Sequence, residues 1–114
     1  VIPEVNSNHL PLAEHQASFP GKIITNPNCS VIGLVTALKP IDALWGIEKA
    51  HVVTLQAISG AGYPGVASFD ILDNVIPFIS GEEDKIETEP LKILGTLEGS
   101  KIIPHTMRLS AQCN

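Results

Sequence analysis

The sequence predicts an α/β or α+β fold in which one mixed sheet is covered by helices. Segments with strand-like and helix-like hydrophobic periodicity alternate along the 114 residues, which is typical of a layered arrangement of both elements. Aromatic residues make up only 4% of the chain, so we expect a core of Ile, Val, Leu and Ala. Hydrophobic residues make up 44%, a high share for a chain of this length, which indicates that some apolar surface faces another surface.

The first elements are expected to be short. Residues 1–4 should form a strand, and residues 9–16 a short helix in a polar loop, with His9 and His15 exposed. Residues 22–25 are largely apolar and are expected to form a second strand.

A longer helix is expected to follow the turn and cap residues Asn26, Pro27 and Asn28, so that Cys29 lies in its first turn. We expect a bend or break at Pro40, with a further turn beyond it. The apolar residues recur at helical spacing: Val31, Ile32, Leu34, Val35 and Leu38.

The second half of the chain continues the alternation. Gly99 and Ser100 are expected to end its long helix. We expect a strand over residues 51–58, a glycine loop over 60–65 and a short helix over 66–72. A loop through Pro77 and Gly81 should lead to a long helix over residues 87–97 and to strands over 101–103 and 106–112.

Cys29 is the most informative residue. Unpaired backbone N–H groups and the positive end of the helix dipole favour a thiolate in the first turn, and a thiolate attacks carbonyl carbon where a thiol does not. On spacing alone, the pattern favours a small buried hydrophobic residue at Cys29 over a nucleophile.

Several motifs in order carry a resemblance that covers nearly the whole chain. They are NPNCS around Cys29, LQAISGAGYPGV, DILDNVIPFISGEE, TEPLKILG and the terminal SAQCN. Together they resemble the aspartate-semialdehyde dehydrogenase family, most closely its archaeal and fungal branch, which also contains malonyl-CoA reductases.

The resemblance implies NADPH-dependent reduction of aspartyl phosphate to aspartate semialdehyde, a step in lysine, threonine and methionine biosynthesis. Cys29 would carry the acyl group as a thioester, and backbone N–H groups at the helix start would hold the oxyanion. The catalytic set implied is Cys29, Asn28 and Gln56. Gln56 would orient the substrate, although its pattern also fits the solvated face of an edge strand.

Glu89 and Lys92 match the family's substrate-binding pair. Three residues apart on a helix, they also fit an ordinary surface pair. The run Gly60 to Gly65 fits GxGxxG, but no clean helix and parallel strand follow it, so we interpret it as a tight loop. The resemblance implies that Ser59 and Gly60 in this loop approach NADP held by another domain.

The sequence departs from the family in what it lacks. The family's carboxylate-binding arginine and general acid–base histidine come shortly after the segment that ends at Asn114, and the nucleotide-binding domain is absent apart from residues 1–4, which resemble its closing strand. We therefore expect residues 1–20 to be the end of that domain and a connector, and residues 21–114 a partial catalytic and dimerisation domain resembling the C-terminal domain of glyceraldehyde-phosphate dehydrogenases. The chain alone is expected to be inactive.

Two alternatives stay open: a malonyl-CoA reductase, and a non-catalytic oligomerisation fragment. The resemblance, together with the excess of apolar residues, implies a homodimer or homotetramer. A net charge of −5 with scattered basic residues argues against nucleic-acid binding, and no apolar run reaches the roughly 18 residues of a membrane span.

Histidine and cysteine spacing predicts no metal site. Two cysteines are too few for a disulfide scaffold and suit a cytoplasmic thiol enzyme. Cys113 is expected to be a buried packing residue, with a Cys29–Cys113 disulfide left open.

Overall fold

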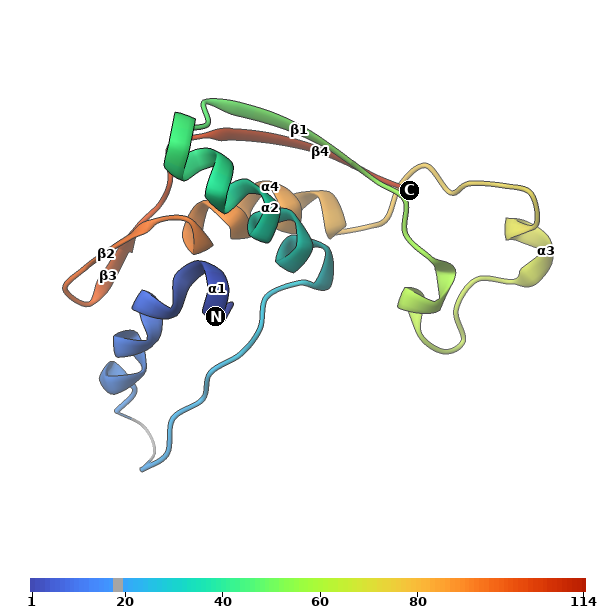
Figure 1. The fold of residues 1–114 in the computed structure, drawn as a ribbon. Coiled ribbons are helices and arrows are strands. Elements are labelled where there is room, and N and C mark those ends of the chain that lie inside the picture. The colour runs from blue at the N-terminus through green and yellow to red at the C-terminus, as the bar shows by residue number, and fades with distance from the viewer. Residues whose placement is uncertain (18–19) are drawn as a thin grey trace.

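The computed structural model describes residues 1–17 and 20–114, arranged as helices on one side of a narrow sheet, with a long arm at one end (Figure 1). In chain order the elements are α1 (Pro3–Asn6), the 3-10 helix η1 (Ser7–His15), α2 (Cys29–Trp45), β1 (Lys49–Thr54), the 3-10 helix η2 (Ile58–Ala61), α3 (Ser68–Ile71), α4 (Glu82–Ile93), β2 (Thr96–Glu98), β3 (Lys101–Ile103) and β4 (Arg108–Cys113).

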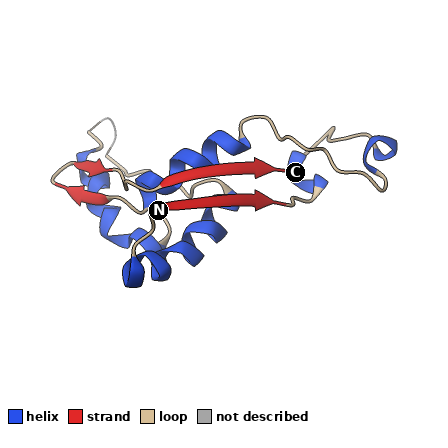
Figure 2. Cartoon of the chain, turned by 90° about the horizontal axis from the view of Figure 1, so that it is seen from above, coloured by secondary structure: helices blue, strands red, loops and turns tan. Residues whose placement is uncertain are grey.

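The sheet consists of β1 and β4, which pair in parallel from Lys49↔Arg108 to Thr54↔Cys113. Helices α2 and α4 cover one face of this pair, as Figures 1 and 2 both show. The other sheet is the antiparallel hairpin of β2 and β3. The α/β class is confirmed, but among the described residues the parallel and antiparallel strands form two separate two-stranded sheets instead of one mixed sheet.

The core lies where α2, α4 and β4 meet. Burying an aliphatic side chain of this size stabilises the fold by about 1.5–3 kcal/mol, and the members are almost all aliphatic, as the composition predicts. The fully buried side chains are Val31, Val35, Ile86, Pro90 and Cys113. The prediction that Cys113 is a packing residue is confirmed.

The N-terminal segment differs from the prediction. Residues 3–6 form helix α1 instead of a strand, because Pro3 at the helix start has a backbone angle suited to a helix and the Asn6 Oδ1 accepts the Ile2 N–H at 2.8 Å. His9 is buried instead of exposed. Its ring joins Asn6 Nδ2 (3.1 Å) to the Gly95 carbonyl oxygen (3.1 Å), which ties the N-terminal segment to the end of α4.

Residues 22–25 do not form a strand. The Gln16 amide both donates to the Ile23 carbonyl oxygen (2.8 Å) and accepts the Ile23 N–H (2.9 Å), so a side chain takes the place of a neighbouring strand. Helix α2 runs through Pro40 to Trp45 without a break. Pro40 and Thr36 are exposed, so water can hydrate the Thr36 carbonyl that loses its helical partner.

In the second half, β1 begins two residues earlier and ends four residues earlier than predicted, in register with β4. Helix α4 occupies residues 82–93 instead of 87–97, because Gly81, in the left-handed region at φ 78°, starts it and three acidic residues favour its first turn. Gly99 (φ 59°) forms the turn of the β2–β3 hairpin and does not end a helix. Strand β2 (Thr96–Glu98) was not predicted, because the expected helix extended to residue 97.

Residues 55–81 form an arm that extends from the end of β1 and carries η2 and α3 (Figure 1). Large hydrophobic side chains on this arm are exposed: Leu55, Ile58, Tyr63, Phe69, Leu72, Val75, Ile76 and Phe78. Much of the apolar surface that the composition indicates therefore lies on this arm, and the end of α2 carries more of it at Leu44 and Trp45.

Candidate functional site

Asn28 organises the start of α2, as its turn chemistry predicts. Its Oδ1 accepts the Ser30 N–H at 2.9 Å and the Val31 N–H at 3.3 Å, which makes it the N-cap residue. Cys29 is the first residue of the helix, and its side chain is exposed. The predicted location of Cys29 in the first turn is confirmed, and the alternative of a buried hydrophobic residue is wrong.

Both cysteines of the described chain are free, so the Cys29–Cys113 disulfide that the sequence left open is not formed.

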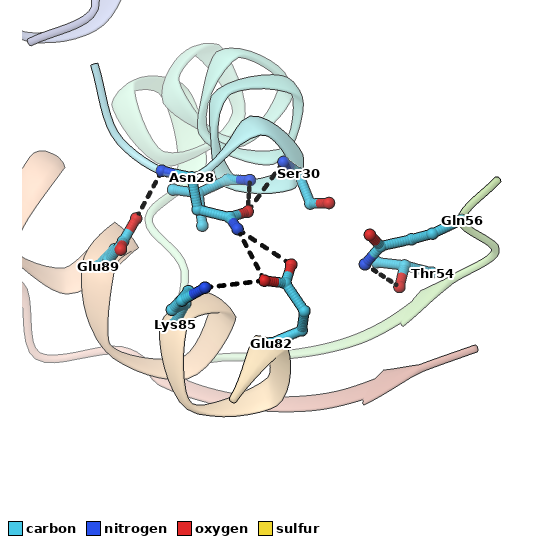
Figure 3. Close-up of polar contacts among 8 residues, drawn as sticks. Asn28, Ser30, Thr54, Gln56, Glu82, Lys85 and Glu89 are labelled. Atoms are coloured by element: carbon cyan, nitrogen blue, oxygen red, sulfur yellow. Dashed lines mark hydrogen bonds and ion pairs between the residues drawn. The ribbon is translucent and has the colours of Figure 1, made fainter. Parts of the chain in front are cut away.

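Glu82 connects helix α4 to this cap. The Asn28 Nδ2 donates to both carboxylate oxygens of Glu82, at 3.1 and 3.0 Å (Figure 3). Lys85, one turn further along α4, donates from Nζ to Glu82 Oε1 at 3.0 Å. The Glu82 side chain is 13% exposed and that of Lys85 is 49% exposed, so the carboxylate is enclosed while the ammonium group reaches solvent.

Each of these two groups stabilises the charged form of the other. The hydrogen bond from Lys85 lowers the pKa of Glu82 below its usual 4.5, against the opposing effect of burial, and the hydrogen bonds from Asn28 lower it further. The pKa of Lys85 is raised, mainly by Glu82 and to a smaller extent by the charges of Glu89 and Cys29. The site therefore holds a fixed negative charge at Glu82 and a fixed positive charge beside Cys29.

The predicted pair Glu89 and Lys92 lies on the same face of α4. Glu89 Oε2 accepts the backbone N–H of Asn28 at 3.0 Å, so Glu89 supports the cap residue. Lys92 lies one turn further on and lines an open cavity of about 410 Å³ together with Asn26, Pro27 and Glu89. The structure thus brings Glu89 to the start of α2 and places Lys92 beside the chain that leads to it.

Gln56 follows β1 and is half-buried. Its Nε2 donates to Thr54 Oγ1 at 3.2 Å, and its amide points toward Glu82 (Figure 3). Its backbone N–H donates to the Asn114 carbonyl oxygen at 2.8 Å. The structure therefore places Gln56 and the end of β4 beside Glu82, which binds the residue before Cys29 (Figure 3).

Ser59 and Gly60 lie in η2 at the start of the arm, and both are exposed. The glycine run ends in a loop, and the next helix, α3, has only four residues, so the expectation that no long helix follows the GxGxxG run is confirmed.

Glu82 and Lys85 were not among the predicted site residues. With Glu89 and Lys92 they occupy helix positions i, i+3, i+7 and i+10, which share one face. That spacing is visible in the sequence, but the expected helix began at residue 87, after both. Within residues 1–17 and 20–114, no three His, Cys, Asp or Glu side chains gather as a metal site requires, and no helix is long and apolar enough to cross a membrane.

Comparisons with known proteins identify the family of this chain. A family model described as semialdehyde dehydrogenase, dimerisation domain, matches residues 38–114. The chain belongs to the semialdehyde dehydrogenase family. Among curated members, the aspartate-semialdehyde dehydrogenase of Archaeoglobus fulgidus is 55% identical over 117 residues, and that of Schizosaccharomyces pombe is 50% identical over 123 residues.

A solved structure of this semialdehyde dehydrogenase family also matches. It is the aspartate-semialdehyde dehydrogenase of Candida albicans with NADP, which is 43% identical with a TM-score of 0.82 over 99% of this chain. The resemblance to the archaeal and fungal branch is confirmed. The chain covers 34% of the length of each of these three relatives.

Proposed function

We propose that this chain is part of an aspartate-semialdehyde dehydrogenase, which reduces aspartyl phosphate to aspartate semialdehyde with NADPH in amino-acid biosynthesis. The observation that carries the proposal is the exposed Cys29 at the capped start of α2, with Glu82, Lys85 and Gln56 beside it. We assign residues 1–20 to the end of the nucleotide-binding domain and a connector, and residues 21–114 to part of the catalytic and dimerisation domain.

In the proposed reaction the Cys29 thiolate attacks the acyl carbon. A C–S bond forms, and the C–O bond to the phosphate breaks with its electron pair on the departing oxygen. Asn28 Oδ1 already occupies the Ser30 and Val31 N–H groups, so the Cys29 N–H, which has no acceptor among the described residues, is the donor that remains for the oxyanion.

Positive charge beside Cys29 suits an anionic substrate. The Lys85 ammonium group is half-exposed, and Glu82 stabilises its charged form. Its positive charge can therefore stabilise the negative charge of the departing phosphate. Lys92 and Glu89 line the adjoining cavity, and we retain them as substrate contacts, with Glu89 also holding the Asn28 backbone. Gln56 would orient the acyl group from the opposite side.

This chain would supply only one part of the NADP site, at Ser59 and Gly60. Ser59 and Gly60 are exposed, and a side chain built at Gly60 would meet no described atom within 4 Å, so their backbone is open to a cofactor held by another domain. When bound, NADPH supplies the hydride that reduces the thioester. Asn114 pairs with Thr54 and Gln56, so the end of β4 lies next to Gln56.

The test uses the full-length protein that contains this sequence. Purified protein should oxidise NADPH in the presence of aspartyl phosphate, and Cys29→Ser should abolish this activity while the variant stays folded. A protein that instead oxidises NADPH only with malonyl-CoA would be the reductase alternative, and an inert Cys29 in a stable oligomer would identify an oligomerisation module.

We also propose a cytoplasmic homodimer or homotetramer. The domain family is one of dimerisation domains, and the arm from residue 55 to residue 81 exposes apolar side chains that a second subunit would cover. Light scattering at micromolar concentration should therefore give at least twice the mass of one full-length chain, and a monomer would refute this part of the proposal.

A further inference from the structure

Two glutamate side chains of α4 bind the backbone of β4. Glu87 Oε1 accepts the Ala111 N–H at 2.9 Å, and Glu83 Oε1 accepts the Cys113 N–H at 3.1 Å. These N–H groups would otherwise be open to pairing with another strand, so the carboxylates act in place of a neighbouring strand.

The contacts lie on the edge of β4 that faces away from β1. The Arg108 N–H donates to Glu48 and the Asn114 N–H donates to Thr54, so the even-numbered residues of β4 direct their N–H groups toward β1. Because successive N–H groups of a strand point to opposite sides, those of Ala111 and Cys113 lie on the edge of β4 that has no strand partner among the described residues, which we call the free edge.

The spacing of the two glutamates matches the spacing of the strand. Four residues of a helix advance about 6.0 Å and two residues of a strand about 6.6 Å, so Glu83 and Glu87 meet alternate residues when the helix runs antiparallel to the strand. A shift of α4 along β4 would break both contacts. The pair therefore fixes where α4 lies along its axis and how it is rotated.

One carboxylate oxygen of Glu83 is buried without a hydrogen-bond partner among the described residues. This atom, Oε2, is the single side-chain nitrogen or oxygen of the described, non-exposed residues that is buried without a hydrogen-bond partner. An unpaired buried acceptor destabilises a fold, so a carboxylate at this position is not explained by stability alone.

We propose that Glu83 and Glu87 are positioning residues, which lock α4 to the free edge of β4 and thereby hold Glu82, Lys85 and Glu89 at the start of α2. Glu82 is adjacent to Glu83 in the helix, and it binds Asn28 while Glu83 binds β4. The proposal rests on the proposed function, since the residues held in place are those assigned to its reaction.

The experiment compares variants of the full-length enzyme. Glu83→Ala and Glu87→Ala should each lower kcat about 10- to 100-fold, because small displacements of catalytic groups cost this much. Glu83→Gln keeps a carbonyl acceptor of the same length and should recover kcat to within about threefold of wild type. The control is Asp84→Ala in the same helix turn, since the exposed Asp84 side chain makes no hydrogen bond or ion pair to the described residues.

A structural role alone would lower the melting temperature and leave kcat per folded enzyme unchanged. Circular dichroism at the assay temperature therefore accompanies each kinetic measurement. Wild-type kcat in folded Glu83→Ala and Glu87→Ala would overturn the proposal, and so would a Glu83→Gln variant as impaired as Glu83→Ala. If Glu83→Ala does not fold, Glu87→Ala decides.

Amide hydrogen exchange separates this proposal from the proposed function. Glu87→Ala should speed exchange of the Ala111 N–H, and Glu83→Ala that of the Cys113 N–H, each at least tenfold, whatever the enzyme's substrate. If the variants show this faster exchange but the wild-type protein is inactive, the proposed function is refuted, and so is the catalytic role of the contacts between α4 and β4. Unchanged exchange in both variants would refute the lock itself.

Discussion

The Asn28 side chain contributes to stability in two ways, as the cap of α2 and as a hydrogen-bond donor to Glu82, and two substitutions separate them. Asn28→Ser keeps an N-cap oxygen but cannot reach Glu82, whereas Asn28→Ala loses both. The cap contributes about 1 kcal/mol. The hydrogen bonds to the Glu82 carboxylate, which is 13% exposed and therefore poorly rehydrated, contribute about 1.5–3 kcal/mol. We expect Asn28→Ser to lower the free energy of unfolding by about 1.5–3 kcal/mol and Asn28→Ala by about 1 kcal/mol more.

The assay is equilibrium urea unfolding of the full-length protein followed by circular dichroism, with the alkylation rate of Cys29 by iodoacetamide as a second measurement. The cap fixes the first turn of α2, so Asn28→Ala should change the alkylation rate of the exposed Cys29, and Asn28→Ser, which keeps the cap oxygen, should change it less. The buried Cys113 serves as an internal reference. Unfolding midpoints equal to wild type in both variants would refute the assignment of Asn28 as an energetic link between α2 and α4.

Three further results are expected. Glu82→Gln should destabilise the protein near neutral pH, and the difference in unfolding free energy from wild type should shrink as the pH falls through 4.5 and below. The reason is that the contacts that lower the pKa of Glu82 stabilise the fold only while its carboxylate is charged. A pH-independent difference in urea titrations would contradict this. His9→Phe leaves the Asn6 amide and the Gly95 carbonyl unpaired and should cost about 2–4 kcal/mol of unfolding free energy, whereas His15→Phe, at an exposed site, should cost little. Gly95→Ala would place a Cβ 2.4 Å from the Ile103 carbonyl oxygen and should lower the melting temperature, while Gly33→Ala, with no described atom within 4 Å, should raise it; the opposite order would contradict the close approach at Gly95.

The sequence predicted those elements whose local chemistry agrees with their packing. The cap at Asn28 and the apolar spacing after Cys29 define α2, and both are properties of neighbouring residues. Strand β4 and the short helix α3 were also placed within a few residues, because their hydrophobic pattern is bounded by turn residues.

The errors fall where distant contacts decide. Residues 22–25 have the composition of a strand, but the amide of Gln16 occupies Ile23, and no residue pattern shows this. His9 lies in a polar segment, and its burial depends on the Gly95 carbonyl 86 residues away. The early start of α4 depends on Gly81 adopting a left-handed conformation, which the loop before it left open.

The site shows the same division in its chemistry. Cys29 could be predicted because the start of a helix gives its thiol a local electrostatic environment. Its charged neighbours could not, because Glu82 and Lys85 come from a helix that starts 53 residues later and is joined to the start of α2 through Asn28. One residue thus caps the helix that bears the nucleophile and binds the helix that bears the charges. Any change that moves α4 relative to α2 should therefore alter the reactivity of Cys29 before it unfolds the protein.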